Sequence, residues 1–439
     1  MKKIIFIIGC WLLVNGSFAQ TVSQQLQKAF QQFEGDPQLK HAISSLYVID
    51  ASTGKVVFDK NSKIGLAPAS TQKIITATTA FDLLGKYYRY KTELGYKSKI
   101  DNSVLNGNLY FIGSGDPTLG SDRWERTRDS FLMNNWWQDI RKAGINRING
   151  SIWFAARNFS VKSIPDGWIW QDIGNYYGAG SNVLNWRENQ YDILLHSSKK
   201  VGDSVEIISP KESLTSELKS APKGTGDNAY VYYDKSISGT IPVGESSFKV
   251  SAAETDPIGV LCNDFSRYLS SKNLQSEARE KFYSGPTASE GIETDSALYI
   301  ISTHYSPSLD SIIYWFLQKS INLYGEALIK TFAYEKNGFG STDAGVKIVK
   351  DFWKQKGIEE DELNIGDGSG LSPQNRVTTH AQVEILKYAK KRPWFSYFYN
   401  ALPEYNDMKM KSGTIKDVKG FCGYHKARNG KEYIFFFFG

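Results

Sequence analysis

Ser70 and Lys73, a serine and a lysine three residues apart, could together form an activated nucleophile. On a helix this spacing places both side chains on one face, and the helix N-terminus favours negative charge on the attacking oxygen. Lys73 can accept the serine proton only if burial and a nearby positive charge lower its pKa. The pair therefore predicts a nucleophile and a lysine base, provided that a helix begins here.

Two later stretches carry complementary groups. Ser320-Ile321-Asn322 brings a hydroxyl and an amide, and Lys411-Ser412-Gly413-Thr414 brings a cation, a glycine and a second hydroxyl. None of the three stretches predicts a catalytic site by itself. Ser-x-x-Lys, the pattern of Ser70 and Lys73, also occurs at Ser52, and Ser-x-Asn is typical of an ordinary helix terminus. Together they provide the groups that acyl transfer requires, and Lys411 could supply the positive charge beside Lys73.

The residues around Ser70 predict the helix that this chemistry requires. The turn-like Leu66-Ala67-Pro68-Ala69 precedes the serine, and the apolar residues that follow have helical spacing up to a predicted C-cap at Gly85. Ser70 is therefore expected in the first turn of a buried helix. A second helix, from Ser308 to Leu323, is expected to present Ser320 near its C-terminal end.

The two ends of the chain predict one five-stranded antiparallel sheet, flanked by helices, in an α/β (α+β) fold. Turn residues at Ala51-Ser52-Thr53-Gly54 and at Asn429-Gly430 each join two β-rich runs into a hairpin. The expected strands are residues 45–50, 55–59, 409–416, 420–426 and 432–438.

A large insert is expected between the first two chemical stretches, because about 250 residues separate them and one small domain does not need that length. We predict an inserted β-rich domain at residues 96–295, between two parts of one catalytic domain at residues 20–95 and 296–439. Its expected elements are a helix at residues 124–144 and strands at residues 90–97, 103–112, 148–154, 191–196 and 204–208.

The N-terminus predicts export to the bacterial periplasm. Residues 1–19 contain Lys2 and Lys3, an apolar run and a small-residue cleavage site, as in a cleavable signal peptide. A lipoprotein anchored at Cys10 is a less favoured alternative. No later stretch reaches the roughly 20 apolar residues of a membrane helix. The formal charge of +6, which is +4 after loss of Lys2 and Lys3, is too small and dispersed to predict nucleic-acid binding.

No metal or cofactor is predicted, since the five histidines show no metal-ligand spacing. Cys262 and Cys422 remain after signal cleavage, and the strand-like sequence around Cys422 favours a buried thiol over a disulfide between them. The aromatic stretches Trp168-Ile169-Trp170 and Tyr176-Tyr177 could stack on sugars, but packing explains them more simply.

The three stretches, in this order, resemble those of the low-molecular-mass class C penicillin-binding proteins, which are D-alanyl-D-alanine carboxypeptidase/endopeptidases of penicillin-binding protein 4 type. Residues 108–119, 174–180 and 367–372 also look like recurrent segments of that family, so the resemblance spans nearly the whole mature chain. The long insert separates the chain from serine β-lactamases. The family pattern also implies a further C-terminal segment beyond Gly439 that would help to cover the sheet.

The resemblance implies a β-lactamase/transpeptidase-like catalytic domain without a cofactor, and a role for each matching residue. Ser70 would attack the carbonyl between two terminal D-alanines, Lys73 would accept its proton, and Ser320 would relay a proton to the departing D-alanine. The implied substrate-binding residues are Asn322, Lys411, Ser412, Gly413 and Thr414. Asp367 and Ser369 could border the cleft or form only a turn.

The implied partners are peptidoglycan stem peptides, and β-lactams would be covalent inhibitors. The balance of carboxypeptidase and endopeptidase action stays open, because both would use one active site. Two alternatives remain, namely a β-lactam hydrolase or esterase on the same scaffold and a non-catalytic protein that binds the cell wall.

Overall fold

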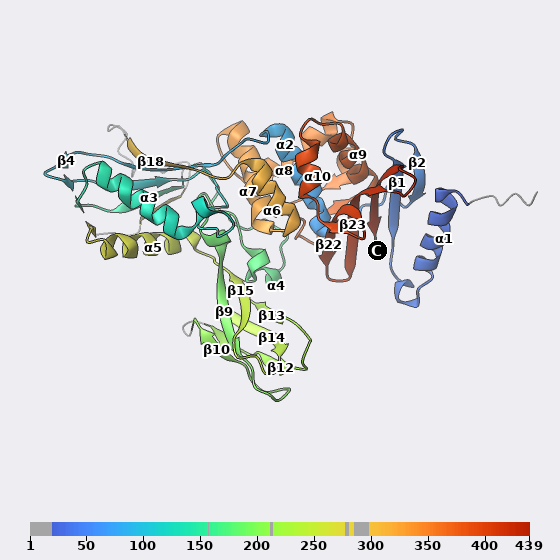
Figure 1. Cartoon of the computed structure of the whole chain (residues 1–439), viewed down its shortest axis with the longest axis horizontal. Helices are drawn as coiled ribbons and strands as arrows, with labels where there is room; N and C mark the ends of the chain where they lie inside the picture. Colours follow the sequence, from blue (N-terminus) through green and yellow to red (C-terminus); the bar gives the residue numbers. More distant parts are fainter. Residues whose placement is uncertain (1–19, 157, 211–213, 277–280, 285–297) are drawn as a thin grey trace, which may run out of the picture.

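The computed structural model describes residues 20–156, 158–210, 214–276, 281–284 and 298–439. The expected signal peptide, residues 1–19, lies outside the described residues. Figure 1 shows an elongated body with a smaller lobe that projects from its middle. We call residues 20–90 and 306–439 the main unit, residues 91–189 and 254–305 the first insert unit, and residues 190–253, which form the projecting lobe, the second insert unit.

The main unit contains an antiparallel sheet with the strand order β2-β1-β24-β23-β22-β21. The sequence predicts five of these strands, and β21 is a two-residue addition at the edge. It pairs with the start of β22 across Asn406 and Asp407, whose φ angles of 49° and 60° suit a two-residue hairpin turn. The strands are β1 (Ser45–Asp50), β2 (Val56–Lys60), β21 (Glu404–Tyr405), β22 (Met408–Ile415), β23 (Val418–Lys426) and β24 (Glu432–Phe438).

Phenylalanines at the end of β24 pack on both faces of this sheet, because successive side chains of a strand point to opposite sides. Phe436 and Phe438 enter the main hydrophobic core. On the other face Phe437 meets Phe33 of α1 (Val22–Glu34), with ring centroids 5.0 Å apart. The helix α1 therefore covers the face of the sheet opposite to the main core.

Six further helices share the main hydrophobic core with the sheet (Figure 1). Of these, α9 packs directly on β1, β23 and β24. The helix α2 lies among these helices and contacts α6, α7, α8 and α9. The sequence predicts Ser70 in the first turn of this helix, whereas Ser70 lies in the 3-10 turn Ala69–Gln72 that leads directly into it. Gly85 follows the C-cap of α2 with a φ of 79°. The helices are α2 (Lys73–Leu83), α6 (Leu309–Gln318), α7 (Asn322–Asn337), α8 (Thr342–Gln355), α9 (Thr379–Lys390) and α10 (Phe395–Ala401).

The predicted helix from Ser308 to Leu323 is wrong in its second part. The helix α6 ends at Gln318, and α7 begins at Asn322. Between them Ser320 has a φ of 57°, a left-handed conformation that ends one helix and turns the chain into the next. Apolar spacing continues through this break, so the pattern alone did not reveal it.

The first insert unit is built on a five-stranded sheet with the order β17-β8-β6-β3-β18, covered by two helices. Because β3 and β18 pair with each other, the chain enters and leaves the insert through neighbouring strands, slightly outside the predicted range of 96–295. These elements are β3 (Lys91–Tyr96), β6 (Leu109–Ile112), β8 (Ile152–Ala156), β17 (Lys281–Ser284), β18 (Tyr299–Tyr305), α3 (Asp129–Lys142) and α5 (Pro257–Ser271).

The predicted strand at residues 103–112 divides at Asn106-Gly107-Asn108. Its first part is β5 (Val104–Leu105), which belongs to a small separate sheet, and its second part is β6. A Cβ atom on Gly107 would lie 2.3 Å from the Lys97 carbonyl oxygen, so the glycine permits a close crossing of two chain segments. The other strands of the small sheet are β4 (Ile100–Asp101), β7 (Arg147–Ile148) and β16 (Gln275–Ser276).

The second insert unit consists of two small sheets around a separate hydrophobic cluster. The predicted strands at residues 191–196 and 204–208 correspond to β9 and β10. The strands are β9 (Gln190–His196), β10 (Glu206–Ser209), β11 (Thr215–Ser216), β12 (Lys219–Ala221), β13 (Asn228–Val231), β14 (Ser236–Pro242) and β15 (Phe248–Ala253).

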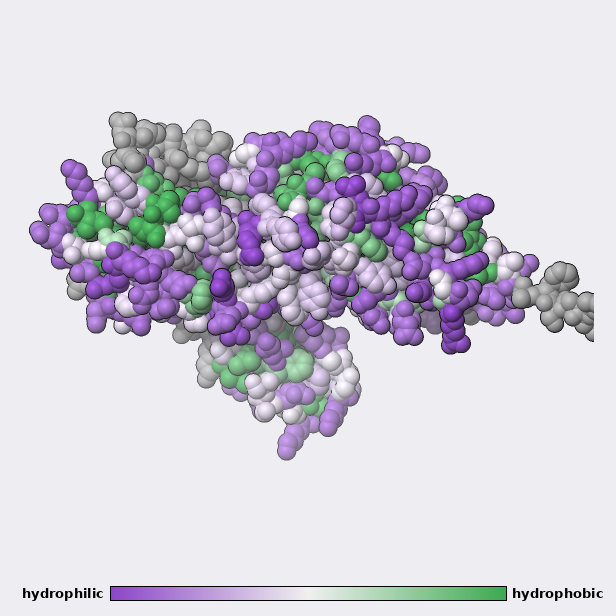
Figure 2. Space-filling model, turned by 45° about the horizontal axis from the view of Figure 1, so that its top comes forward, coloured by the Kyte–Doolittle hydropathy of each residue, from purple (hydrophilic) through white to green (hydrophobic). Residues whose placement is uncertain are grey.

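The two cysteines are buried in different hydrophobic clusters and form no disulfide with each other. Cys262 lies in α5 of the first insert unit, and Cys422 lies in β23 of the main unit. None of the helices in the described part of the chain combines the length and apolar composition needed to cross a membrane. Figure 2 shows hydrophilic residues over most of one face of the molecule.

Candidate active site

Ser70 and Lys73 lie beside each other where a short 3-10 turn, Ala69–Gln72, continues into α2. Lys73 is fully buried, and its Nζ lies 2.8 Å from Ser70 Oγ. The preceding Ala69 is also buried and has a φ of 46°, which is unfavourable for a residue with a side chain. The turn therefore presents the serine hydroxyl directly to the lysine amine.

Two further groups hold the amine of Lys73. Its Nζ donates hydrogen bonds to Asn322 Oδ1 at 2.6 Å and to the Ser369 carbonyl at 2.8 Å. Burial, and then the charge of Lys411, hold the pKa of Lys73 well below its usual value, although Asp367 and Glu326 act in the opposite direction. A neutral amine in this position can accept the proton of Ser70.

Ser320 and Asn322 face the same space from the junction between α6 and α7. Asn322 is buried, and its Nδ2 donates to the Tyr177 carbonyl at 2.7 Å, while its Oδ1 accepts from Lys73. The left-handed conformation of Ser320 lets this junction border the cleft instead of continuing as helix. Asn322 thus connects the lysine to a segment of the first insert unit.

The strand β22 lies along the turn that carries Ser70, but only part of the predicted Lys411–Thr414 stretch reaches the cleft. Thr414 is exposed and borders the cleft with Ser70. Lys411 is buried, its Nζ donates to the Ser412 carbonyl at 2.7 Å, and burial lowers its pKa to about 8. A Cβ atom on Gly413 would lie 2.9 Å from Ser70 N, so glycine permits the close contact. Ser412 does not border the cleft.

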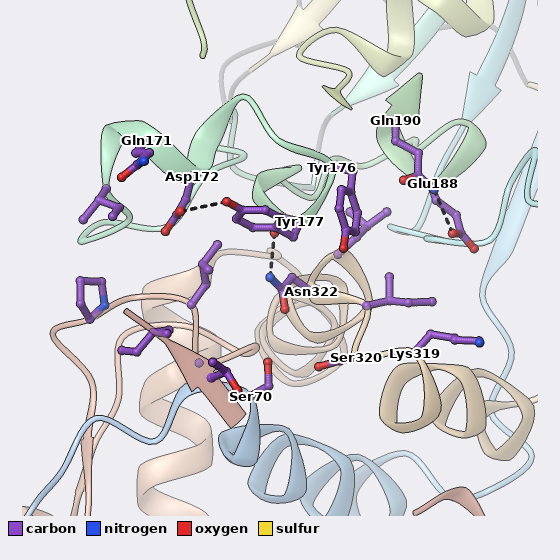
Figure 3. A pocket seen from close by; sticks show the side chains of 18 of the residues that line it. Ser70, Gln171, Asp172, Tyr176, Tyr177, Glu188, Gln190, Lys319, Ser320 and Asn322 are labelled. Atoms are coloured by element: carbon purple, nitrogen blue, oxygen red, sulfur yellow. Dashed lines mark hydrogen bonds between the residues drawn. The ribbon is translucent and has the colours of Figure 1, made fainter. Parts of the chain in front are cut away.

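The cleft has a volume of about 1010 Å³ and lies between the main unit and both insert units. Figure 3 shows Ser70 and Ser320 on one side, and Asp172, Tyr176 and Tyr177 on the other. Asp172 belongs to the short helix α4 (Trp170–Ile173) and accepts from the Tyr177 hydroxyl at 3.2 Å. The insert therefore forms the wall opposite the nucleophile.

The sequence analysis missed Glu326, a buried carboxylate behind Lys73, and left the role of Asp367 open. Glu326 lies in α7 one turn after Asn322, and its carboxylate accepts from the backbone N–H of Gly368 and Ser369. The Asp367 carboxylate accepts five hydrogen bonds, including one of 2.9 Å from Trp168 Nε1. The segment 367–372 stood out in the sequence, and a carboxylate in the apolar helix α7 was a second available signal.

A second missed cluster lies at the other end of the cleft. Glu188 accepts from Arg123 Nε at 2.7 Å and from the Tyr324 hydroxyl at 2.6 Å. It occupies a left-handed turn in which Arg187, Glu188 and Asn189 have φ angles of 53°, 55° and 51°. Nothing in the local sequence predicts this turn, because none of its three residues is glycine. In the described part of the chain no cluster of histidine, cysteine or acidic residues could hold a metal ion.

Comparison with known proteins assigns the chain to a family of D-Ala-D-Ala carboxypeptidases. A family model described as the D-Ala-D-Ala carboxypeptidase 3 (S13) family matches residues 24–404. The D-alanyl-D-alanine carboxypeptidase of Actinomadura sp. (strain R39) is 23% identical and covers 90% of this chain and 77% of its own length. The D-alanyl-D-alanine carboxypeptidase DacB of Haemophilus influenzae is 23% identical and covers 87% of this chain and 82% of its own length.

Solved structures share the fold. The crystal structure of penicillin binding protein 4 (dacB) from Haemophilus influenzae has a TM-score of 0.76 at 22% identity and covers 90% of both chains. Its complex with a novel β-lactam has a TM-score of 0.72 at 20% identity, with 91% of this chain and 90% of that chain covered. The predicted fold class and the predicted family resemblance are confirmed.

Proposed function

This chain belongs to the D-Ala-D-Ala carboxypeptidase 3 (S13) family and is a serine peptidase, and on that premise we propose that it releases the terminal D-alanine of peptidoglycan stem peptides through an acyl-enzyme at Ser70. We further propose that it also cleaves peptide cross-links of the same chemistry, and that it acts in the periplasm after removal of residues 1–19. The contact of 2.8 Å between Ser70 Oγ and the buried Lys73 Nζ supports the acyl-enzyme most directly.

In the proposed reaction Ser70 Oγ attacks the carbonyl carbon of the penultimate D-alanine while Lys73 Nζ takes the hydroxyl proton. The tetrahedral intermediate then expels the terminal D-alanine, whose nitrogen receives a proton through Ser320 Oγ. Water hydrolyses the Ser70 ester and restores the free serine. Asn322 holds Lys73 in place through the contact of 2.6 Å and would also hold the substrate peptide.

The strand β22 would bind the substrate and stabilise the developing charge. We propose that the backbone N–H groups of Ser70 and Thr414 receive the oxyanion, and each such donor is worth roughly 3 to 4 kcal/mol. The Thr414 hydroxyl would donate to the terminal carboxylate of the substrate, and the charge of Lys411 would attract it. A free C-terminal carboxylate would then be preferred, and β-lactams would react with Ser70 to give a slowly hydrolysed ester.

The proposal predicts that Ser70→Ala abolishes covalent labelling. The purified protein without residues 1–19 is incubated with a fluorescent penicillin, and intact mass spectra follow the adduct over time. Ser52→Ala is the matched control, because Ser52 also precedes a lysine by three residues but lies in the exposed turn between β1 and β2. We expect a persistent adduct on the wild type and on Ser52→Ala.

Other outcomes identify the alternatives. Labelling of Ser70→Ala would contradict the assigned nucleophile. A short-lived adduct with continued consumption of the antibiotic would indicate a β-lactam hydrolase or esterase. Binding to purified cell wall without any adduct or D-alanine release would indicate a non-catalytic protein.

A further inference from the structure

Glu326 is a fully buried carboxylate that the proposed reaction does not use. It lies one helical turn after Asn322 on α7 and points toward the segment 367–370. Its Oε1 accepts from Ser369 N at 2.9 Å, and its Oε2 accepts from Gly368 N at 3.1 Å. A buried carboxylate is costly unless such donors compensate it, so its place behind the active lysine requires an explanation.

The backbone segment at Gly368 and Ser369 contacts both Glu326 and Lys73. The Ser369 N–H donates to Glu326, while the Ser369 carbonyl accepts from Lys73 Nζ at 2.8 Å. The segment is pressed against α7, because a Cβ atom on Gly368 would lie 2.2 Å from the Gly325 carbonyl oxygen. A continuous path therefore runs from Glu326 through Ser369 to Lys73 and on to Ser70.

We propose that Glu326 is a positioning residue for Lys73. Glu326 orients the Ser369 carbonyl, and this carbonyl in turn orients the lysine amine toward Ser70. The proposal rests on the proposed function, since it assigns Glu326 a part in Ser70 acylation. Ser369 contributes through its backbone, and its side chain has no part in the proposal.

Because Glu326 and Lys73 are surrounded by charged groups, the positioning role of Glu326 should also affect how the acylation rate depends on pH. Lys411, Asp367 and Glu326 act on Lys73, and Asp367, Lys73 and Lys330 face Glu326. Lys330 Nζ donates to the carbonyls of Lys162 and Ser181 instead of forming an ion pair with Glu326. Burial, and then Asp367, raise the pKa of Glu326 to about 8.

Replacing Glu326 should move the acidic limb of the acylation profile to lower pH. When ionised, Glu326 favours the charged form of Lys73, and its removal lowers the lysine pKa. When protonated, Glu326 still orients the Ser369 carbonyl, which binds an ammonium more strongly than an amine. Loss of this orientation therefore also lowers the pKa of Lys73. Both effects have the same sign, so neutral Lys73 would appear at lower pH in the variant.

The test measures the second-order rate constant of acylation by penicillin between pH 5 and 10, with thermal unfolding recorded for each protein. Glu326→Gln keeps the shape but has only one acceptor oxygen. Because Glu326 is protonated below its pKa of about 8, glutamine carries the same charge there. We expect the plateau rate to fall about tenfold and the acidic limb to move down by about half a pH unit, through the changed orientation of the Ser369 carbonyl. Glu326→Ala should lower the plateau by about a hundredfold, as expected for a displaced catalytic group.

Thr76→Val is the matched control. The Thr76 hydroxyl donates to the Gly368 carbonyl at 2.7 Å, so the variant loosens the same segment without changing a charge or a contact of Ser369. We expect its acidic limb to stay in place and its rate to remain within a few-fold of the wild type. Equal shifts in Thr76→Val and Glu326→Gln, or a wild-type profile for Glu326→Gln, would overturn the inference. An unlabelled wild type would instead overturn the proposed function.

Discussion

The proposed function requires different charges, at the same pH, on two buried lysines of the candidate site. In the proposed reaction Lys73 must be neutral to accept a proton, whereas Lys411 must be charged to attract the substrate carboxylate. Lys73 is the more strongly affected, because it is fully buried and Lys411 repels its charged form. The pKa of Lys411 is lowered only to about 8, so most of its charge remains at neutral pH. Position, and not residue type, separates the two roles.

The pKa of Lys411 predicts a change in substrate binding at alkaline pH. As the pH rises through about 8, Lys411 loses its charge and the KM for a D-Ala-D-Ala peptide should rise, by about tenfold for each further pH unit. Lys411→Arg keeps its charge to much higher pH, so its KM should stay flat across this range. Steady-state kinetics from pH 6.5 to 10 provides the measurement.

Lys409→Arg serves as the control for this prediction, because Lys409 lies on the same strand but pairs with Glu404 at 3.1 Å. Its KM should follow the wild type. A wild-type KM that is constant to pH 10 would refute the assignment of the carboxylate-binding charge to Lys411.

At the scale of elements, the site depends on how closely β22 approaches the turn that carries Ser70. A Cβ atom on Gly413 would lie 2.7 Å from the Pro68 carbonyl oxygen and 2.9 Å from Ser70 N. Neither atom can move away easily, because both belong to the backbone. The strand and the turn are therefore matched in position only when residue 413 is glycine.

Gly413→Ala should separate β22 from the Ser70 turn. We expect the acylation rate to fall about a hundredfold and the free energy of unfolding to fall by about 1 to 3 kcal/mol. Penicillin labelling and urea denaturation measure the two effects. Gly366→Ala is the control, since the nearest atom to its Cβ would be 3.8 Å away. Wild-type labelling by Gly413→Ala would argue against the tight contact.

At the scale of the whole molecule, the insert lines the cleft of the candidate active site and contacts the residues around it. Hydrogen bonds join the insert to the main unit. The Tyr177 carbonyl accepts from Asn322 Nδ2, and the Glu188 carboxylate accepts from the Tyr324 hydroxyl. Trp168 Nε1 donates to the Asp367 carboxylate. Each contact joins the insert to an element that holds a site residue. The insert thus supports the positions of α7 and of segment 367–372, besides forming one wall of the cleft.

Trp168 and Trp170 allow a direct test of this support. Trp168→Phe removes the hydrogen bond to Asp367 but keeps most of the buried ring, and we expect acylation to slow by roughly fivefold. Trp170 is 53% exposed, so Trp170→Phe should acylate like the wild type. Stopped-flow fluorescence with a labelled penicillin measures both rates. Equal rates in the two variants would mean that the insert does not support the site through Trp168.

Local patterns in the sequence were sufficient for much of the fold. The alternating strands, the turn at Asn429-Gly430 and the helix after Ser70 depend on neighbouring residues, so the sequence predicted them closely. The three chemical stretches were also visible, because a nucleophile and its partners need particular residue types at short spacings.

The tertiary structure decided what depends on distant residues. The break at Ser320, the left-handed turn at Glu188 and the hydrogen bonds of Glu326 involve segments far apart in the chain, and no local pattern encodes them. The low pKa of Lys73 also requires burial and the charge of Lys411, which only folding brings near. The sequence determined which chemical groups this protein has. The packing determined the protonation states and the orientations of these groups, because both depend on distances between side chains.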